Sequence, residues 1–297
     1  MRKNIVTIVC FLFLSSSCQL FAQVQFFESN GVKIRYITKG SGVPVVLIHG
    51  MTQNIESSWS VPIEGGNLIE RLSKNHQVIA LDCRGHGKSD KPHDSTQYGT
   101  RMVKDVLNLL DYLHIDKAHF IGFSMGAIIA GNLQLDYPDR VLSTVLSGAL
   151  IATKKVNQQA GIQYAMKNTA SDITAGRGMY SMIKWLDLPQ DNKPAISDKQ
   201  ALDIGKFLIQ GNDSVAIVSV LKAFDQFDVK EKQLKRNKIP TLVIIGTQDH
   251  SIIAARQHIR HFKNARLKEI AGKEHAGILS SKEYYNAVEE FINQQTL

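Results

Sequence analysis

A serine framed by two glycines, in the segment Gly122-Phe123-Ser124-Met125-Gly126, most constrains how this chain can fold. The apolar residues before it, 117–121, predict a buried strand, and residues 127–135 predict a helix. Between a strand and a helix, the G-x-S-x-G spacing predicts a sharp turn with a strained serine backbone, because only small residues fit on either side. Such a turn lifts the Ser124 hydroxyl above a sheet edge, where the helix N-terminus favours developing negative charge.

Apolar runs and helical patterns alternate along most of the chain. We predict strands at 24–28, 32–37, 43–48, 77–82, 117–121, 141–147, 240–246 and 265–270, and helices at 68–72, 102–113, 127–135, 252–262 and 284–292. Asn30-Gly31 between the first two strands predicts a hairpin. Strands separated by helices predict an α/β fold with a mostly parallel sheet, helices on both faces and a mixed edge where the hairpin lies.

Residues 150–236 interrupt this alternation, because they lack strand-like runs and their pattern indicates several helices. We therefore expect a helical cap at 150–236, inserted between a first core segment at 23–149 and a second at 237–297. An insert at this position lies over Ser124. Its apolar side chains are expected to form the core of the cap, and Trp185 is the candidate for a wall of the substrate pocket.

The N-terminus has the pattern of a secretory signal peptide. Arg2 and Lys3 precede an apolar run at residues 5–14, which is shorter than the roughly 20 residues needed to span a bilayer, and small residues follow. We expect residues 1–22 to be removed and the mature protein to be exported, either periplasmic or secreted. Lipid attachment at Cys18 is the alternative, although Ser15 stands where the usual motif has an aliphatic residue.

The composition excludes several other classes of protein. The formal charge is +8, but the basic residues are scattered except for a small cluster at 230–238, and no nucleic-acid motif accompanies them. The sequence contains no HExxH motif, paired CxxC motifs or phosphate-binding loop, so we expect no metal and no cofactor. No nucleic-acid or stable protein partner is predicted. Only Cys83 would remain after the leader is removed, which excludes an intramolecular disulfide.

Reactive side chains follow several of the predicted strands, and the carboxyl ends of parallel strands meet at one edge of a sheet. Ser124, Asp249 and His275 occur in that order along the chain. His275 is the candidate base that takes the proton of Ser124, and Asp249 is the candidate that orients the imidazole. The backbone N–H groups of Met51 and Met125 are candidates for the oxyanion hole.

At these positions the chain resembles the α/β-hydrolase superfamily, in particular its capped esterases, C–C hydrolases and cofactor-free haloperoxidases. The resemblance covers the whole mature chain and rests on His49-Gly50, residues 82–89, the elbow at Ser124, residues 240–249 and the His275 loop. It implies that Asp82, Arg84 and His86 form a structural turn beside the site. Serine at the elbow differs from the aspartate of epoxide hydrolases and haloalkane dehalogenases. The sequence departs from the family pattern at His250-Ser251, where proline usually follows the acid closely.

We therefore expect an exported serine hydrolase that cleaves a carboxylic ester or related acyl compound through an acyl-enzyme. The substrate is expected to be a small molecule with an apolar group. A C–C bond hydrolase or a perhydrolase uses the same triad and is the alternative. A non-catalytic binding module on this fold is the hypothesis from another class, and retention of serine, aspartate and histidine counts against it.

Overall fold

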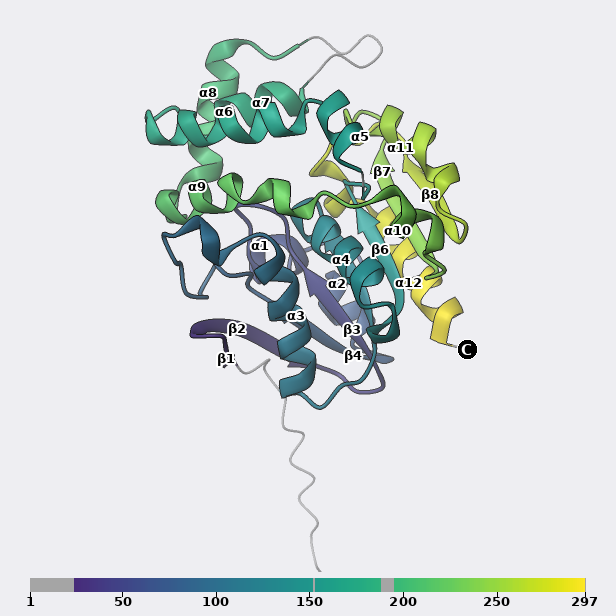
Figure 1. The fold of residues 1–297 in the computed structure, drawn as a ribbon. Coiled ribbons are helices and arrows are strands. Elements are labelled where there is room, and N and C mark those ends of the chain that lie inside the picture. Colours follow the sequence, from purple (N-terminus) through teal and green to yellow (C-terminus); the bar gives the residue numbers. More distant parts are fainter. Residues whose placement is uncertain (1–23, 152, 188–194, 297) are drawn as a thin grey trace, which may run out of the picture.

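The computed structural model describes residues 24–151, 153–187 and 195–296, and the strands in these ranges form one eight-stranded sheet (Figure 1). In spatial order they are β1 (Gln25–Ser29), β2 (Val32–Lys39), β4 (His76–Leu81), β3 (Val43–Ile48), β5 (Ala118–Phe123), β6 (Val141–Ser147), β7 (Thr241–Gly246) and β8 (Ala265–Ile270). The β2 strand is antiparallel to β1 and β4, and the other neighbours are parallel. The predicted mostly parallel sheet with a mixed edge is confirmed. The predicted signal peptide and Cys18 lie outside the described residues.

The β1–β2 hairpin turns at the predicted Asn30-Gly31 pair. Both residues have a positive φ, 51° for Asn30 and 78° for Gly31. Two-residue hairpin loops favour this conformation, because its twist matches that of the flanking strands. The turn thereby fixes the register in which Ser29 pairs with Val32.

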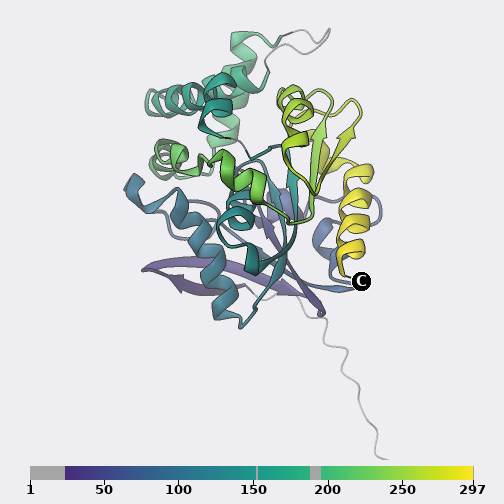
Figure 2. The same ribbon diagram turned by 45° about the vertical axis from the view of Figure 1, so that its right-hand side comes forward.

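Helices cover both faces of the sheet, as predicted (Figure 2). One apolar core lies beneath α3 (Thr100–Tyr112), α4 (Met125–Asp136), α10 (Glu231–Arg236) and α11 (Ile252–His258). The other lies beneath α1 (Ile55–Trp59), α2 (Leu68–Leu72) and α12 (Lys282–Thr296). Residues 252–262 do not form one helix, because a 3₁₀ turn at Ile259–His261 follows α11. Among the described residues, no helix is both long and apolar enough to cross a membrane.

A group of helices between β6 and α10 forms a layer over the sheet (Figure 1). They are α5 (Lys154–Gln159), α6 (Ile162–Thr174), α7 (Tyr180–Leu186), α8 (Asp198–Ile209) and α9 (Ser214–Lys222), followed by a 3₁₀ turn at Phe224–Phe227. The segments that lead into and out of this layer lie side by side, because Thr153 and Val229 form a parallel β-bridge. We call this layer the cap. The α10 helix follows it and contacts the core, where Gln233 Nε2 donates to Asp136 Oδ1 over 2.6 Å.

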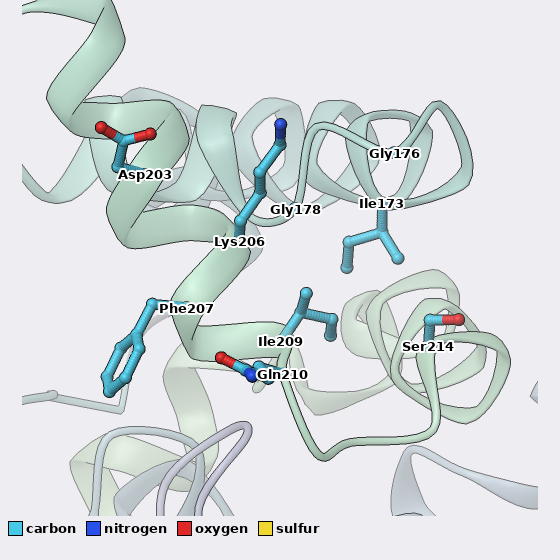
Figure 3. Close-up of a pocket in the computed structure, with 9 residues that line it drawn as sticks. All are labelled: Ile173, Gly176, Gly178, Asp203, Lys206, Phe207, Ile209, Gln210 and Ser214. Carbon is cyan, nitrogen blue, oxygen red and sulfur yellow. The ribbon is translucent and has the colours of Figure 1, made fainter.

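A pocket of about 530 Å³ lies within the cap itself (Figure 3). Its lining comes from α6, α8, the start of α9 and the segments that join them, and Ile173 and Ile209 point toward one another across it. None of these lining residues lines the cavity that contains Ser124. The pocket in Figure 3 is therefore separate from the cavity over the sheet.

The turn at Ser124 has the strained geometry that the glycine spacing predicts. Ser124 has φ 52° and ψ −112°, a region that non-glycine residues rarely occupy. A Cβ atom on Gly122 would lie 2.2 Å from the carbonyl oxygen of Gly126, and a Cβ atom on Gly126 would lie 2.0 Å from that of Ile48. The backbone of α4 thus lies directly against β3 and β5, which only glycine allows.

We expect Gly126→Ala to lower the free energy of unfolding by about 3 kcal/mol or more. The new methyl group would collide with the backbone of a central strand, which cannot move aside as a flexible side chain can. Gly277→Ala is the matched control, because its nearest neighbours are 3.8 Å away in the Lys273 side chain. Urea unfolding followed by circular dichroism measures both variants. Equal losses at the two positions would contradict this account of the elbow.

Candidate active site

The structure brings Ser124, His275 and Asp249 together, although they come from three separate loops. Ser124 lies between β5 and α4, Asp249 follows β7, and His275 follows β8. His275 Nε2 is 3.0 Å from Ser124 Oγ, and His275 Nδ1 is 2.8 Å from Asp249 Oδ2. The His275 side chain is 18% exposed and Asp249 is buried. The imidazole therefore connects a solvent-accessible hydroxyl to a carboxylate that water does not reach.

The protonation of this chain of side chains follows from its partners. A carboxylate only accepts hydrogen bonds, so His275 Nδ1 carries a proton and donates it to Asp249. The lone pair of Nε2 then faces the Ser124 hydroxyl, which donates to it. Burial alone would raise the pKa of Asp249, but His275 and His250 beside it hold that pKa well below its ordinary value. Asp249 is thus ionised at neutral pH.

Two residues that the sequence reasoning did not assign to the site also contact Asp249. Ser251 donates to Asp249 Oδ1 through its backbone N–H, over 2.9 Å, and through its hydroxyl, over 2.7 Å. His250 Nδ1 lies 3.1 Å from the same oxygen. An aspartate followed two residues later by serine favours such a local turn, and this was the available signal. These contacts hold the carboxylate in the orientation that presents Oδ2 to His275.

The imidazole of His275 occupies a space that a glycine leaves open. Gly148, after β6, has φ 68°, and a Cβ atom there would lie 3.1 Å from His275 Cε1. The Phe123 ring packs against the imidazole, with ring centroids 5.2 Å apart. Local sequence patterns do not reveal Gly148, since its role depends on a residue far along the chain.

The loop that carries Met51 is fixed by His49. His49 Nε2 accepts from the Cys83 N–H over 2.9 Å, so Nδ1 carries the ring proton and donates to the Gly50 carbonyl over 2.7 Å. The chain has no cis peptide bond among the described residues, and the C=O and N–H of a trans peptide point in opposite directions. The Met51 N–H therefore points away from the buried His49 ring.

The second predicted donor, the Met125 N–H, belongs to the first residue of α4. The first N–H groups of a helix have no acceptor within the helix. Among the described residues, neither the Met51 nor the Met125 N–H has a hydrogen-bond acceptor, and both residues line the cavity that contains Ser124. The positive end of the α4 dipole lies at the same place.

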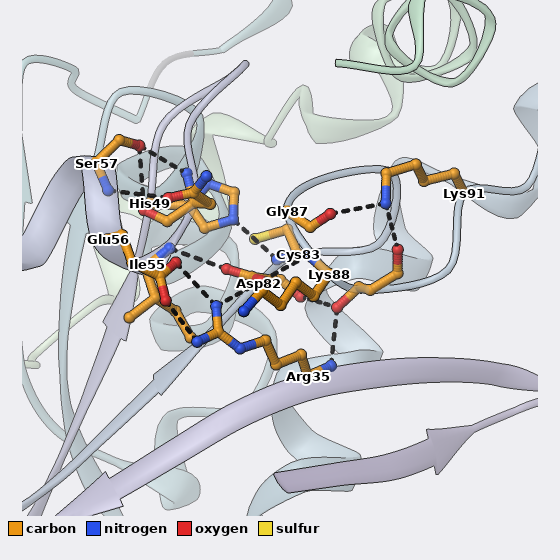
Figure 4. Close-up of polar contacts among 12 residues, drawn as sticks. Arg35, His49, Ile55, Glu56, Ser57, Asp82, Cys83, Gly87, Lys88 and Lys91 are labelled. Atoms are coloured by element: carbon orange, nitrogen blue, oxygen red, sulfur yellow. Dashed lines mark hydrogen bonds and ion pairs between the residues drawn. The ribbon is translucent and has the colours of Figure 1, made fainter. Parts of the chain in front are cut away.

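Asp82 joins the segment at the start of α1 to the turn after β4 (Figure 4). Its Oδ1 accepts from the Ile55 N–H over 2.9 Å at the start of α1, and its Oδ2 accepts from the Lys88 N–H over 2.8 Å. Arg35 lies 3.1 Å from Oδ2 and also pairs with Glu56. Asp82 does not line the cavity, so its carboxylate positions the surrounding loops.

The cavity above Ser124 has a volume of about 460 Å³ and lies between the sheet and the cap. Most of its lining is apolar and includes Ile128, Met166, Met182, Leu208 and Phe224. Trp185 also lines it, and its Nε1–H donates to the Ala160 carbonyl over 2.8 Å. The Trp185 ring meets His250 edge-on, with centroids 4.0 Å apart. Among the described residues, no group of three or more His, Cys, Asp or Glu is arranged to hold a metal ion.

Comparison with known proteins places the chain in a family. A family model described as the alpha/beta hydrolase fold matches residues 43–281. The chain belongs to the α/β-hydrolase family. This match extends from β3 through the elbow and the cap to the loop that holds His275.

Individual relatives of this α/β-hydrolase include enzymes with several reactions. A non-heme chloroperoxidase from Streptomyces lividans is 29% identical over 85% of this chain and 92% of its own length. The 3-oxoadipate enol-lactonase 1 of Acinetobacter baylyi is 30% identical over 61% of this chain and 64% of its own. Several relatives at least 30% identical are matched over less than two thirds of their length. In fold, the hydrolase is similar to a meta-cleavage product hydrolase from Pseudomonas fluorescens, with a TM-score of 0.65, 24% identity and coverage of 91% and 97% of the two chains.

Several histidines of this α/β-hydrolase are buried, and their pKa values are lowered so that they are neutral at pH 7. Burial lowers the pKa of His86 to about 3, and the nearby His49 adds to that effect. Burial likewise lowers the pKa of His119 to about 4, with a smaller effect from His76, while the His119 ring contacts Ser143 Oγ over 2.7 Å. The pKa of His49 is also lowered by burial. In the unfolded chain, histidines take up a proton near pH 6.5.

We expect the free energy of unfolding to fall as the pH is lowered from about 6.5 towards 4. In this window the unfolded chain binds protons that the buried histidines do not, so acid favours unfolding by about 1.4 kcal/mol per pH unit for each group. Urea unfolding at pH 7, 6 and 5 measures the slope. His119→Gln, which removes one of these groups, should give a shallower slope, and an unchanged slope would refute the assignment.

Proposed function

We propose that this protein is an exported serine hydrolase that cleaves a carboxylic ester or a related acyl substrate. The observation that carries the proposal is the position of His275, 3.0 Å from Ser124 Oγ and 2.8 Å from Asp249 Oδ2, at the base of an apolar cavity. The charged, apolar and small-residue pattern of residues 1–22 supports export.

In the proposed reaction, Ser124 Oγ attacks the acyl carbon while its proton passes to His275 Nε2. Asp249 stabilises the imidazolium that forms, because its carboxylate stays ionised beside Nδ1. His275 then returns the proton to the leaving alcohol as the acyl–oxygen bond breaks. Water, activated by the same imidazole, attacks the acyl-enzyme and releases the acid.

The negative charge of the tetrahedral intermediate needs donors on the opposite side of the acyl carbon from His275. We assign this role to the N–H groups of Met51 and Met125, because both residues border Ser124 in the cavity. The hydrogen bond from His49 to the Gly50 carbonyl fixes the Met51 N–H, and the start of α4 fixes the Met125 N–H, before substrate binds. Donors that need no reorganisation stabilise a transition state most strongly, and loss of one costs about 10²–10³-fold in kcat in a comparable enzyme.

The substrate that fits this cavity has an apolar acyl or alcohol group. Methionine, isoleucine, leucine and phenylalanine side chains from the sheet side and the cap supply most of the lining. Burial of apolar substrate surface contributes about 25 cal/mol per Å². We propose Trp185 as a wall of this pocket, since its ring lies between the α5–α6 turn and His250.

Perhydrolysis is the second candidate, and the chloroperoxidase relative of similar length favours it. Both reactions begin with the same acyl-enzyme, and they differ only in whether water or hydrogen peroxide attacks it. When water and hydrogen peroxide compete for the acyl-enzyme formed from one p-nitrophenyl ester, the ratio of carboxylic acid to peracid released distinguishes the two reactions. A binding module, in contrast, would form no acyl-enzyme.

We expect Ser124→Ala to abolish turnover of p-nitrophenyl esters and labelling by a fluorophosphonate probe. Loss of the nucleophile costs about 10⁶-fold in kcat in a comparable triad. Ser147→Ala is the matched control, because Ser147 is a buried serine at the next strand end whose hydroxyl contacts Tyr284 Oη at 3.1 Å. This control should keep its labelling. If Ser124→Ala retained more than a tenth of the wild-type rate, Ser124 would not be the nucleophile.

We expect Trp185→Ala to change the preference among p-nitrophenyl esters of different chain length more than it changes phosphonate labelling by a very small probe. The substitution enlarges the pocket on the side of His250 and leaves Ser124 and His275 in place. Trp185→Phe is the control, since it keeps a smaller aromatic wall and removes the N–H that the Ala160 carbonyl accepts. An unchanged chain-length preference with lower thermal stability would make Trp185 a packing residue only.

A further inference from the structure

The loop that carries Met51 contains a residue in an unfavourable backbone conformation. Thr52 has φ 62°, although a β-branched side chain collides with its own backbone in this region. Such a conformation costs on the order of 1–3 kcal/mol and persists only where surrounding contacts enforce it. Within the loop, the Thr52 hydroxyl donates to the Met51 carbonyl over 2.6 Å. The peptide that follows Thr52 is held by a contact from outside this loop.

A side chain of the cap supplies that contact. Asn212, in the turn between α8 and α9, donates from Nδ2 to the Thr52 carbonyl over 3.2 Å. The same nitrogen donates to the Leu208 carbonyl at the end of α8, also over 3.2 Å, so the amide is oriented by its own helix. Figure 3 shows this turn between Gln210 and Ser214.

The three successive carbonyls of this loop are thus fixed by separate donors. His49 and the Gln53 N–H hold that of Gly50, the Thr52 hydroxyl holds that of Met51, and Asn212 holds that of Thr52. Of these donors, only Asn212 belongs to the cap. The Thr52 carbonyl shares its peptide with the Gln53 N–H, which donates to the Gly50 carbonyl over 3.2 Å, and the Gly50 carbonyl shares its peptide with the Met51 N–H. Without Asn212, a rotation of the Thr52–Gln53 peptide weakens this bond to the peptide that carries the Met51 N–H.

We propose that Asn212 is a positioning residue that links the position of the cap on the core to the geometry of the oxyanion hole. The cap then does more than enclose the substrate, because its contact with Thr52 maintains the direction of the Met51 N–H. This inference rests on the proposed function only for its kinetic consequence. The conformational link between Asn212 and the loop stands on the geometry alone.

The test compares Asn212→Asp with Ser219→Ala. Asn212→Asp keeps the side-chain shape but removes the donor to Thr52. Ser219→Ala removes a comparable contact between cap and core, since Ser219 Oγ donates to the His93 carbonyl over 2.6 Å, away from the Met51 loop. For p-nitrophenyl acetate, Asn212→Asp should lower kcat about tenfold or more with KM changed less than about twofold. Ser219→Ala should leave both constants near the wild-type values.

Hydrogen–deuterium exchange of the peptide that spans residues 49–54 gives a readout independent of activity. Asn212→Asp should accelerate its exchange, and Ser219→Ala should not. Unchanged exchange in Asn212→Asp, an effect on KM alone, or an equal loss of kcat in Ser219→Ala would each overturn the proposal. If the wild type neither hydrolyses esters nor reacts with the phosphonate, the proposed function fails, while the exchange measurement still decides whether Asn212 holds the loop.

Discussion

The direct contact between the backbones of α4 and β3 is the constraint on which the site depends. At Gly126 the helix lies so close to the Ile48 carbonyl that no side chain fits between them. This contact places the N-terminus of α4 beside the end of β3, and β3 leads straight into the loop that carries Met51. This steric contact therefore sets where the Met51 loop begins relative to the Met125 N–H. Side chains alone, with their rotamer freedom, could not hold two donors as closely.

Around this contact, the loops are held by hydrogen bonds to particular backbone groups. His49 reaches the Cys83 N–H and the Gly50 carbonyl, and Asp82 reaches the N–H groups of Ile55 and Lys88. Each side chain thus fixes two chain segments at once. Because the His49 ring and the Asp82 carboxylate are buried, these bonds are little weakened by water. Ser251 and His250 hold the Asp249 carboxylate in place through contacts with its Oδ1.

The sequence alone was sufficient to predict the elements whose cause is local. The strands β6 and β8 and the helix α2 have the predicted bounds, and the elbow follows from glycine sterics around Ser124. The short helix α1 was missed, since it depends on a capping box between Asn54 and Ser57 rather than on apolar periodicity. Gly148 beside His275 and Asn212 beside Thr52 were also missed. Both roles arise from contacts between residues more than a hundred positions apart, which no local pattern encodes.

The parallel bridge between Thr153 and Val229 has a consequence for how the family can diversify. It holds the two ends of the cap insertion next to each other. The sheet is therefore joined to the cap at the same two adjacent points, whatever the segment between them contains. The closure entropy of a segment grows only slowly with its length. Insertions or deletions between these two ends can therefore change the cap while the folding of the sheet is largely unaffected. The cap is thus a segment that can be exchanged without breaking the sheet to which both of its ends are joined.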